Sequence, residues 1–255
     1  MKLLRIDIPK AKLLAMPQTE RVLFVQSTRL LNELLMLNKL LLFTFSKKYD
    51  NKVLMKAQTS YAMFFIRIQI GLLWEGWLLV NKQFHGSCVA KGYQGALSRL
   101  GQESLKELNQ YFGGPNLICR IRNEYSFHYS EECAEKIEKV INEIGETDDM
   151  EVYFSEFYAN CLYPFSDGLV NSAMLDELDS DGKEAVKKLA ADTNKVQKWF
   201  LNFLGALVEV FIKKYFRSKH TEIPIPEPPP PGRVSIPFFI REPEGSSGDG
   251  KQGMA

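Results

Sequence analysis

Residues 183–217, KEAVKKLAADTNKVQKWFLNFLGALVEVFIKKYFR, decide the fold. Their inward-facing positions recur at alternating spacings of three and four without a slip: Val186, Leu189, Thr193, Val196, Phe200, Phe203, Leu207 and Val210. This spacing places side chains on one face of an α-helix, as packing between helices requires. The stretch therefore predicts a long helix with one face in a core that other helices complete.

Two further long helices are predicted closer to the N-terminus. The first begins after Pro17 and ends near Ser46, and four leucines spaced 4, 3 and 4 residues apart share one of its faces: Leu30, Leu34, Leu37 and Leu41. The second covers about residues 52–84 and is apolar on several sides. We therefore expect it to be the most buried element of the protein, with core positions for Phe64, Phe65, Trp74 and Trp77.

The segment between these helices and the last one is more broken. A short helix is predicted over 104–112, ended by Gly113-Gly114-Pro115, and a third main helix over 116–144. Residues 151–178 are mixed and aromatic, and Pro164 and Gly168 are expected to break them. Since no stretch shows a convincing strand alternation, the sequence predicts an all-α protein, an up-and-down bundle of long helices with almost no sheet.

The composition changes after His220. Eight of the 12 prolines lie between Pro224 and Pro243, and the chain from Gly245 onward is rich in glycine, serine and polar residues. Such sequence builds no core, so we expect a disordered proline-rich tail. The apolar run 234–240 is an exception and is expected to dock, either on the bundle or on a partner. The predicted organisation is an N-terminal segment 1–16, a helical bundle 17–220 and a tail 221–255.

Charge is unevenly distributed although the net charge is only +1. Residues 120–184 contain 17 acidic and 5 basic side chains, whereas residues 1–52 contain 10 basic and 4 acidic ones. These segments are either solvated helix faces or surfaces that meet an oppositely charged partner. The overall charge by itself indicates neither nucleic acid nor membrane.

Cysteines and histidines are scattered. The four cysteines form no CxxC pair, and the three histidines lie away from them, which argues against zinc. We expect reduced, mostly buried thiols, a cytoplasmic protein, no metal and no cofactor. Residues 61–80 have about the length of a membrane span but include Arg67, Gln69 and Glu75, so we expect no membrane.

One short stretch, residues 122–129 (RNEYSFHY), combines the residue types of a chemical site. Histidine moves a proton near neutral pH, and arginine holds a phosphate and offsets the charge of a transition state. A metal-independent ribonuclease needs both. Six residues along a helix correspond to about 9 Å of rise and about 120° of rotation. Arg122 must therefore reach back toward His128, or two copies of the stretch must meet across a dimer.

This stretch resembles the signature of the HEPN superfamily of helical-bundle proteins. There, an arginine usually followed by Asn, Asp or His is separated by four to six residues from a histidine; Arg122, Asn123 and His128 match, with five residues between Arg122 and His128. The resemblance covers about eight residues. It implies an all-helical fold, a homodimer that joins two motifs and, often, metal-independent cleavage of RNA. The tail is not part of the family pattern.

The expected function is therefore a HEPN-like, metal-independent endoribonuclease or RNA-binding protein of a defence or toxin-type system. Its catalytic residues are Arg122, Asn123 and His128, and its supporting residues are Glu75, Arg67 and Tyr129. Glu75 and Arg67 lie in the most apolar helix. Because an unpaired buried charge is costly, each is expected to have a partner on another helix.

Two alternatives remain open. One is a non-catalytic helical dimerisation or interaction module that binds a protein or nucleotide. The other is a structural bundle whose proline-rich tail recruits a protein partner. In both, Arg122 and His128 pair with carboxylates of the acidic middle segment. The position of the two side chains relative to a cleft discriminates between these alternatives and the enzyme.

Overall fold

The computed structural model describes residues 1–126, 131–145, 150–176, 178–179, 181–216 and 220–241. The predicted all-α fold is confirmed, because nearly all regular structure is helical. The longest helices are α2, α3 and α9. In chain order the elements are β1 (Lys2–Arg5), α1 (Lys10–Ala15), α2 (Gln18–Thr44), α3 (Lys52–Leu79), η1 (Val80–His85), α4 (Val89–Tyr93), η2 (Gln94–Ala96), α5 (Arg99–Phe112), α6 (Leu117–Ile121), η3 (Arg122–Ser126), α7 (Glu131–Glu143), η4 (Tyr158–Asn160), α8 (Pro164–Asp176), α9 (Gly182–Phe211), η5 (Ile212–Phe216), β2 (Thr221–Pro224) and η6 (Pro231–Arg233).

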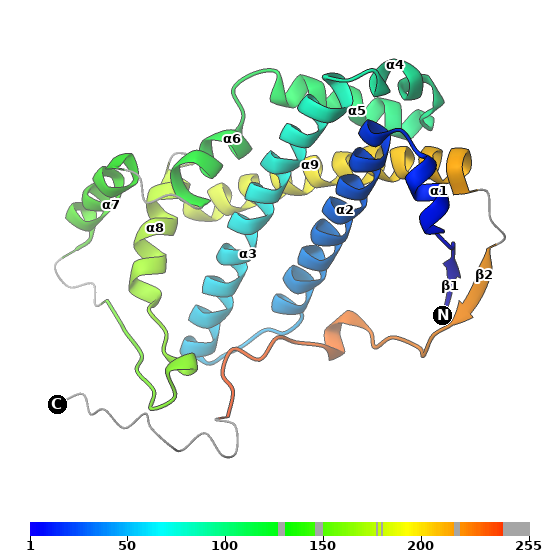
Figure 1. Ribbon diagram of the computed structural model, residues 1–255. Helices are drawn as coiled ribbons and strands as arrows, with labels where there is room; N and C mark the ends of the chain where they lie inside the picture. Colours follow the sequence, from blue (N-terminus) through cyan, green and yellow to red (C-terminus); the bar gives the residue numbers. More distant parts are fainter. Residues whose placement is uncertain (127–130, 146–149, 177, 180, 217–219, 242–255) are drawn as a thin grey trace.

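The long helices are arranged as a hairpin crossed by a third helix. α2 and α3 lie side by side, and α9 runs across both, with α5 packed along it (Figure 1). α3 is central, since it contacts α2, α6, α8 and α9. Short connections explain the hairpin: Asn51 ends the loop after α2 and caps α3, where its side-chain oxygen accepts hydrogen bonds from the backbone N–H groups of Val53 and Leu54 at 2.9 and 3.1 Å.

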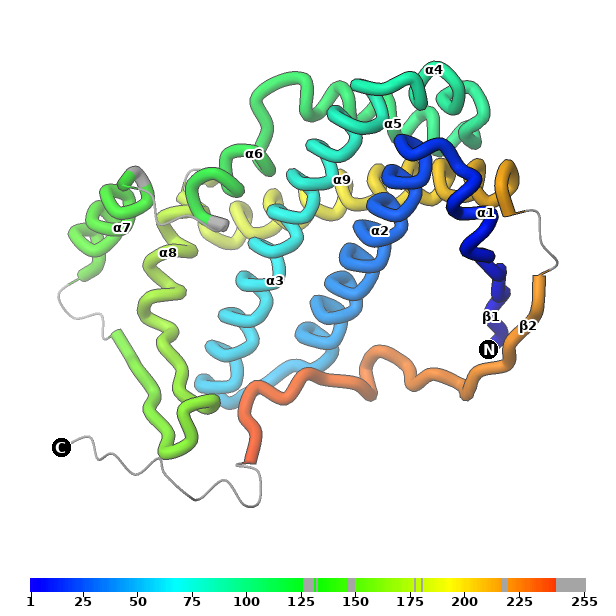
Figure 2. The backbone as a smooth tube through the Cα atoms, in the orientation of Figure 1, coloured from blue at the N-terminus to red at the C-terminus, as the bar shows by residue number. Residues whose placement is uncertain are grey.

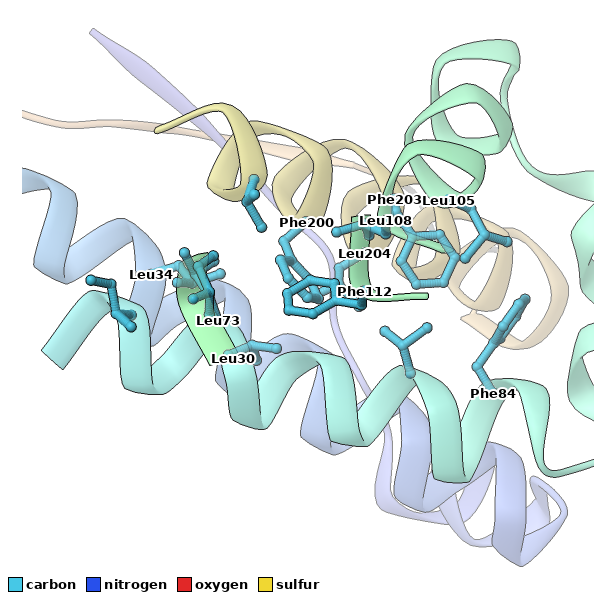
Figure 3. Packing of buried hydrophobic residues seen from close by; sticks show 14 of the residues in the cluster. Leu30, Leu34, Leu73, Phe84, Leu105, Leu108, Phe112, Phe200, Phe203 and Leu204 are labelled. Atoms are coloured by element: carbon cyan, nitrogen blue, oxygen red, sulfur yellow. The ribbon is translucent and has the colours of Figure 1, made fainter. Parts of the chain in front are cut away.

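The core forms where α9 meets α3, α2 and α5. Phe84, Phe200 and Phe203 are fully buried, with the ring centroids of Phe84 and Phe203 5.2 Å apart (Figure 3). Burying large apolar side chains of this kind contributes about 1.5–3 kcal/mol each to folding. The helices approach closely at two glycines. A Cβ atom at Gly101 would lie 2.5 Å from the Cβ of Ala206, and one at Gly76 would lie 2.8 Å from Leu30 Cδ2.

The inward face of α9 follows the predicted spacing from Leu189 to Leu207 and differs from the predicted set at several positions. Val186 is 38% exposed, and the neighbouring Ala185 is buried in its place. Gln197, absent from the predicted face, is 4% exposed because its side-chain oxygen accepts a hydrogen bond from the Gln69 side chain of α3. The polar pair satisfies itself inside the core, which hydropathy alone does not reveal.

Helix α3 with η1, residues Lys52–His85, is long and apolar enough to cross a membrane by length and composition alone. In this structure 44% of its most apolar window is buried. The expectation that it is the most buried element is wrong, because 9 of the 28 residues of α3 are buried, against 11 of the 30 residues of α9. The expectation that Phe64 belongs to the core is wrong, since its side chain is 51% exposed. Trp74 and Trp77, expected in the core, are half-buried against it.

The middle of the chain departs from the predicted boundaries. The expected helix 116–144 appears as α6, the π-helical segment η3 and α7, with residues 127–130 outside the described part. Pro164 does not break a helix but opens α8, where the missing N–H of proline leaves no bond unmade. Gly168 lies within α8. The short helix expected at 104–112 begins earlier, at Arg99, because Ser98 caps it.

The described part of the tail, up to Arg241, lies along the bundle. β2 pairs with β1 in an antiparallel ribbon, and the chain then follows the loop end of the α2–α3 hairpin (Figure 2). Phe238 is 7% exposed, with its ring 5.6 Å from that of Tyr49 and 5.1 Å from that of Tyr61. Both backbone polar groups of Ile240 bond to the Asn160 side chain. Segment 234–240 therefore docks on its own bundle.

Candidate functional site

Arg122 is presented at the surface by a well-anchored turn of helix. Asn116 caps α6, accepting a 2.8 Å hydrogen bond from the backbone N–H of Cys119, and Ile118 and Ile121 are buried in the core. The next residue, Arg122, begins η3, and its side chain is 29% exposed. π-Helical turns of this kind often occur at functional sites. The guanidinium is therefore fixed at its base and open to solvent at its head.

Among the described residues, two side chains contact the Arg122 guanidinium. Asn123 Oδ1 accepts a hydrogen bond from Arg122 Nη1 at 3.2 Å, and Glu75 Oε1 lies 3.7 Å from Arg122 Nη2. Asn123 Nδ2 donates in turn to Cys119 Sγ at 3.6 Å. The structure thus brings together three of the residues selected from the sequence: Arg122, Asn123 and Glu75.

Glu75 has its expected partner but not its expected environment. Its side chain is 61% exposed, so the prediction that it is a buried charge of the apolar helix is wrong. The reason is local: on the side of α3 that faces η3, the helix surface is open to solvent around Arg122. An exposed ion pair of this kind contributes about 0–1 kcal/mol to stability.

Arg67 lies elsewhere on the same helix. It is half-buried near Cys133 of α7, where its charge and that of Lys136 lower the pKa of the thiol, although burial raises that pKa by more. Eight residues, about 12 Å along the helix, separate it from Glu75. Within the part of the chain that the structure describes, Arg67 forms no ion pair, so its predicted partner is not found there.

His128 and Tyr129, the other predicted site residues, lie outside the described residues. The convergence of Arg122 and His128, within one chain or across a dimer, therefore stays a prediction. The structure describes the contacts that hold the segments before and after these residues. Glu124 pairs with Lys136 of α7 at 2.5 Å, and the buried Tyr125 hydroxyl donates to the carbonyl of Ala173 in α8 at 3.1 Å. These contacts fix η3 against α7 and α8.

A groove of about 950 Å³ opens beside the motif, at the upper end of the usual range for ligand sites. It is lined by residues of α3, the end of α5, the α5–α6 connection, α6, the α8–α9 connection and α9: Trp74, Tyr111, Phe112, Gly114, Pro115, Asn116, Leu117, Cys119, Arg120, Leu178, Lys188, Ala191, Asp192 and Lys195. Cys119 belongs both to the groove and to the contacts of Asn123. The groove therefore reaches the motif.

The groove is lined by aromatic and by basic side chains. Three cationic side chains line it, Arg120, Lys188 and Lys195, against one carboxylate, Asp192. The Tyr111 hydroxyl donates a hydrogen bond to Asp192, and burial together with this bond raises the pKa of the tyrosine. Lys188 pairs with Asp179 at 2.5 Å, while Lys195 Nζ lies 4.8 Å from the ring centroid of Trp199.

Sequence reasoning did not identify this groove, although one signal was present. Lys188 and Lys195 are seven residues apart in α9, a spacing that places both on one face of a helix. Trp74 was expected in the core because it belongs to the most apolar helix. The pairing of these elements depends on contacts between residues far apart in the chain, which spacing within one helix does not specify.

The described residues contain no group of three or more His, Cys, Asp or Glu side chains placed to hold a metal ion. The four cysteines are free thiols, as expected from their spacing, but only Cys133 is buried and Cys88 is exposed. Comparison with protein-family models, curated proteins and solved structures found no match to the chain.

Proposed function

We propose that this protein is a HEPN-like, metal-independent endoribonuclease that acts as a homodimer on RNA, with Arg122, Asn123 and His128 as its catalytic residues. The observation that carries the proposal is the setting of Arg122. Its guanidinium is solvent-accessible, held by Asn123 Oδ1 at 3.2 Å, and next to a basic and aromatic groove. A purely structural arginine has no need of such a groove.

The chemistry requires few groups. The ribose 2′-hydroxyl attacks the adjacent phosphate, so the nucleophile is internal and the protein must position and stabilise. Arg122 holds the phosphate, since guanidinium groups match phosphate oxygens in charge and geometry. Asn123 orients Arg122. His128 takes the proton of the hydroxyl or gives one to the leaving oxygen.

Incubation with total RNA in excess EDTA tests the proposal. The wild type is expected to cut RNA and to leave single-stranded DNA intact, because DNA lacks the 2′-hydroxyl. His128→Ala and Arg122→Ala are each expected to lower the rate by about 10²–10⁴-fold, the usual effect of losing a positioned proton-transfer group or charge. Cleavage that persists in both variants, or that needs magnesium, contradicts the mechanism.

Matched controls separate catalysis from general effects. Arg99 is also a surface arginine paired with a glutamate, Glu103, at 3.2 Å, so Arg99→Ala removes a similar ion pair far from the motif. His220→Ala removes an exposed histidine. Both control variants are expected to cut RNA at the wild-type rate. Equal melting temperatures for all four variants establish that the loss of activity is chemical.

One observation favours the alternative interaction module. Several large apolar side chains are exposed on the α2–α3 hairpin: Leu35, Met36, Leu42, Phe45 and Phe64. Exposed apolar side chains that gather into one patch mark sites of protein association. If the purified wild type cuts no RNA in any buffer, this module becomes the better function, and the hairpin is then the surface to examine.

A further inference from the structure

We infer that the groove between α3, the α5–α6 connection and α9 binds single-stranded RNA next to Arg122. In this arrangement a base stacks on the indole of Trp74, and the phosphates follow Lys188 and Lys195 of α9. The inference rests on the proposed function for the kind of ligand, RNA. The site itself stands on the geometry of the groove.

The aromatic and the cationic side chains of the groove match the two halves of a nucleotide. Trp74 is half-buried and its ring contacts Phe112, with centroids 6.2 Å apart, so it offers a supported aromatic surface. Every base has a π-face, which makes stacking on such a ring independent of sequence. α9 supplies the ammonium groups of Lys188 and Lys195, which attract phosphates.

The spacing of the cations fits a strand rather than a single phosphate. Lys188 and Lys195 lie seven residues apart on α9, about 10 Å along the helix axis. At about 3.4 Å per stacked nucleotide this corresponds to roughly three nucleotides. Within the described residues Lys195 forms no ion pair, so its charge is available to a phosphate. Lys188 is paired with Asp179, so a strand that reaches both lysines exchanges that carboxylate for a phosphate at Lys188.

The groove and the motif are adjacent on two helices, α6 and α3. Cys119, at the groove edge, accepts the hydrogen bond from Asn123 Nδ2, and Arg120 precedes Arg122 by two residues. On α3, Trp74 is next to Glu75, whose carboxylate faces Arg122. A strand that leaves the groove at Cys119 therefore arrives at the Arg122 guanidinium.

Fluorescence anisotropy with a labelled ten-nucleotide 2′-O-methyl RNA tests the inference, because this strand cannot be cut. Trp74→Leu is expected to weaken binding about 5- to 150-fold, the usual effect of losing one stacking platform. Lys195→Glu is expected to weaken binding at least tenfold. It should also reduce the slope of log K against log salt by about 0.7, the value for one lost phosphate contact on a single strand.

Lys198→Glu is the matched control. It makes the same charge change on the same helix, but Lys198 does not line the groove. Binding within about twofold of the wild type is expected for Lys198→Glu. Wild-type affinity in both Trp74→Leu and Lys195→Glu overturns the inference, as does an equal loss in Lys198→Glu. Lys195 is exposed, so its replacement leaves the core intact even if Trp74→Leu perturbs folding.

The two proposals fail in different ways. If the wild type cuts no RNA but Lys195→Glu loses affinity for the uncut strand, the groove assignment stands and the ribonuclease does not. If the wild type cuts RNA and Lys195→Glu cuts it with unchanged KM, the ribonuclease stands and the groove assignment is wrong. Support for both requires a raised KM in Lys195→Glu with kcat near the wild-type value.

Discussion

Replacing Glu75 by Gln is expected to strengthen RNA binding with little effect on stability. Glu75 Oε1 lies 3.7 Å from Arg122 Nη2, and the two side chains are 61% and 29% exposed. The carboxylate therefore competes with an RNA phosphate for the same guanidinium. Glutamine keeps the size of the side chain and removes the charge, so the variant isolates this competition.

The magnitude follows from the distance and the exposure. Two unit charges at 3.7 Å in water interact with about 1 kcal/mol, and exposed ion pairs contribute about 0–1 kcal/mol to stability. The melting temperature should therefore fall by no more than about 4 °C. The same 1 kcal/mol, released for binding, corresponds to a gain in RNA affinity of up to about fivefold.

Anisotropy titration at low salt measures this gain, and raising the salt should reduce it because exposed charges are screened. Glu103→Gln is the matched control, since it removes the charge from a similar exposed pair with Arg99. RNA affinity in that variant should not change. Weaker binding or slower cleavage in Glu75→Gln would refute the reasoning, because Glu75 would then position Arg122 rather than compete with phosphate.

Three further predictions concern stability. Gln197→Leu leaves the Gln69 amide unpaired in the core, so the free energy of unfolding measured in urea should fall by about 1–3 kcal/mol. The double variant with Gln69→Leu should recover most of that loss, and additive losses would contradict the pairing. Burial raises the pKa of Glu20, but hydrogen bonds from Tyr215, Tyr93 and Lys214 outweigh it and hold the pKa below 4.5. The difference in unfolding free energy between the wild type and Glu20→Gln should therefore be largest near neutral pH and shrink as the pH falls below about 4.5. A difference that grows in acid would refute this prediction. Phe238→Ala should lower the unfolding free energy by about 2 kcal/mol and expose residues 225–241 to limited proteolysis. Unchanged melting and digestion would show that the docked segment contributes nothing to stability.

The long helices could be predicted from the sequence because their signals are local. The uninterrupted spacing in α9 and the leucine face of α2 each depend on residues within a few turns of one another. The exceptions are positions where the packing of another element determines whether the side chain is buried. Val186 is exposed although it fits the pattern, and Gln197 is buried although it is polar, because Gln69 on α3 satisfies it.

The tail illustrates the same limit. Its proline content predicts a disordered segment, whereas the described part, up to Arg241, forms β2 and η6 and lies outside the long helices. The docking of Phe238 between Tyr49 and Tyr61, and of Ile240 on Asn160, depends on residues 80 or more positions away in the chain. Composition describes what a segment can do by itself. It does not describe a surface that distant residues offer to it.

The candidate site combines a local sequence motif with a groove formed by residues that are distant in the chain. The charge pattern around it supports treating the motif and the groove as one binding site. The motif is contiguous and could be recognised, whereas the groove is formed by Trp74, the α5–α6 connection and α9. Residues 120–184 carry a strong negative charge, which would repel RNA over most of that surface. Arg120 opens this acidic segment, and Lys188 and Lys195 lie just beyond it on α9. The fold therefore gathers positive groups from both borders of the segment at the groove that leads to Arg122. An RNA strand that is repelled elsewhere along this segment is attracted to the groove. The groove therefore lies where the proposed cleavage at the motif needs its substrate.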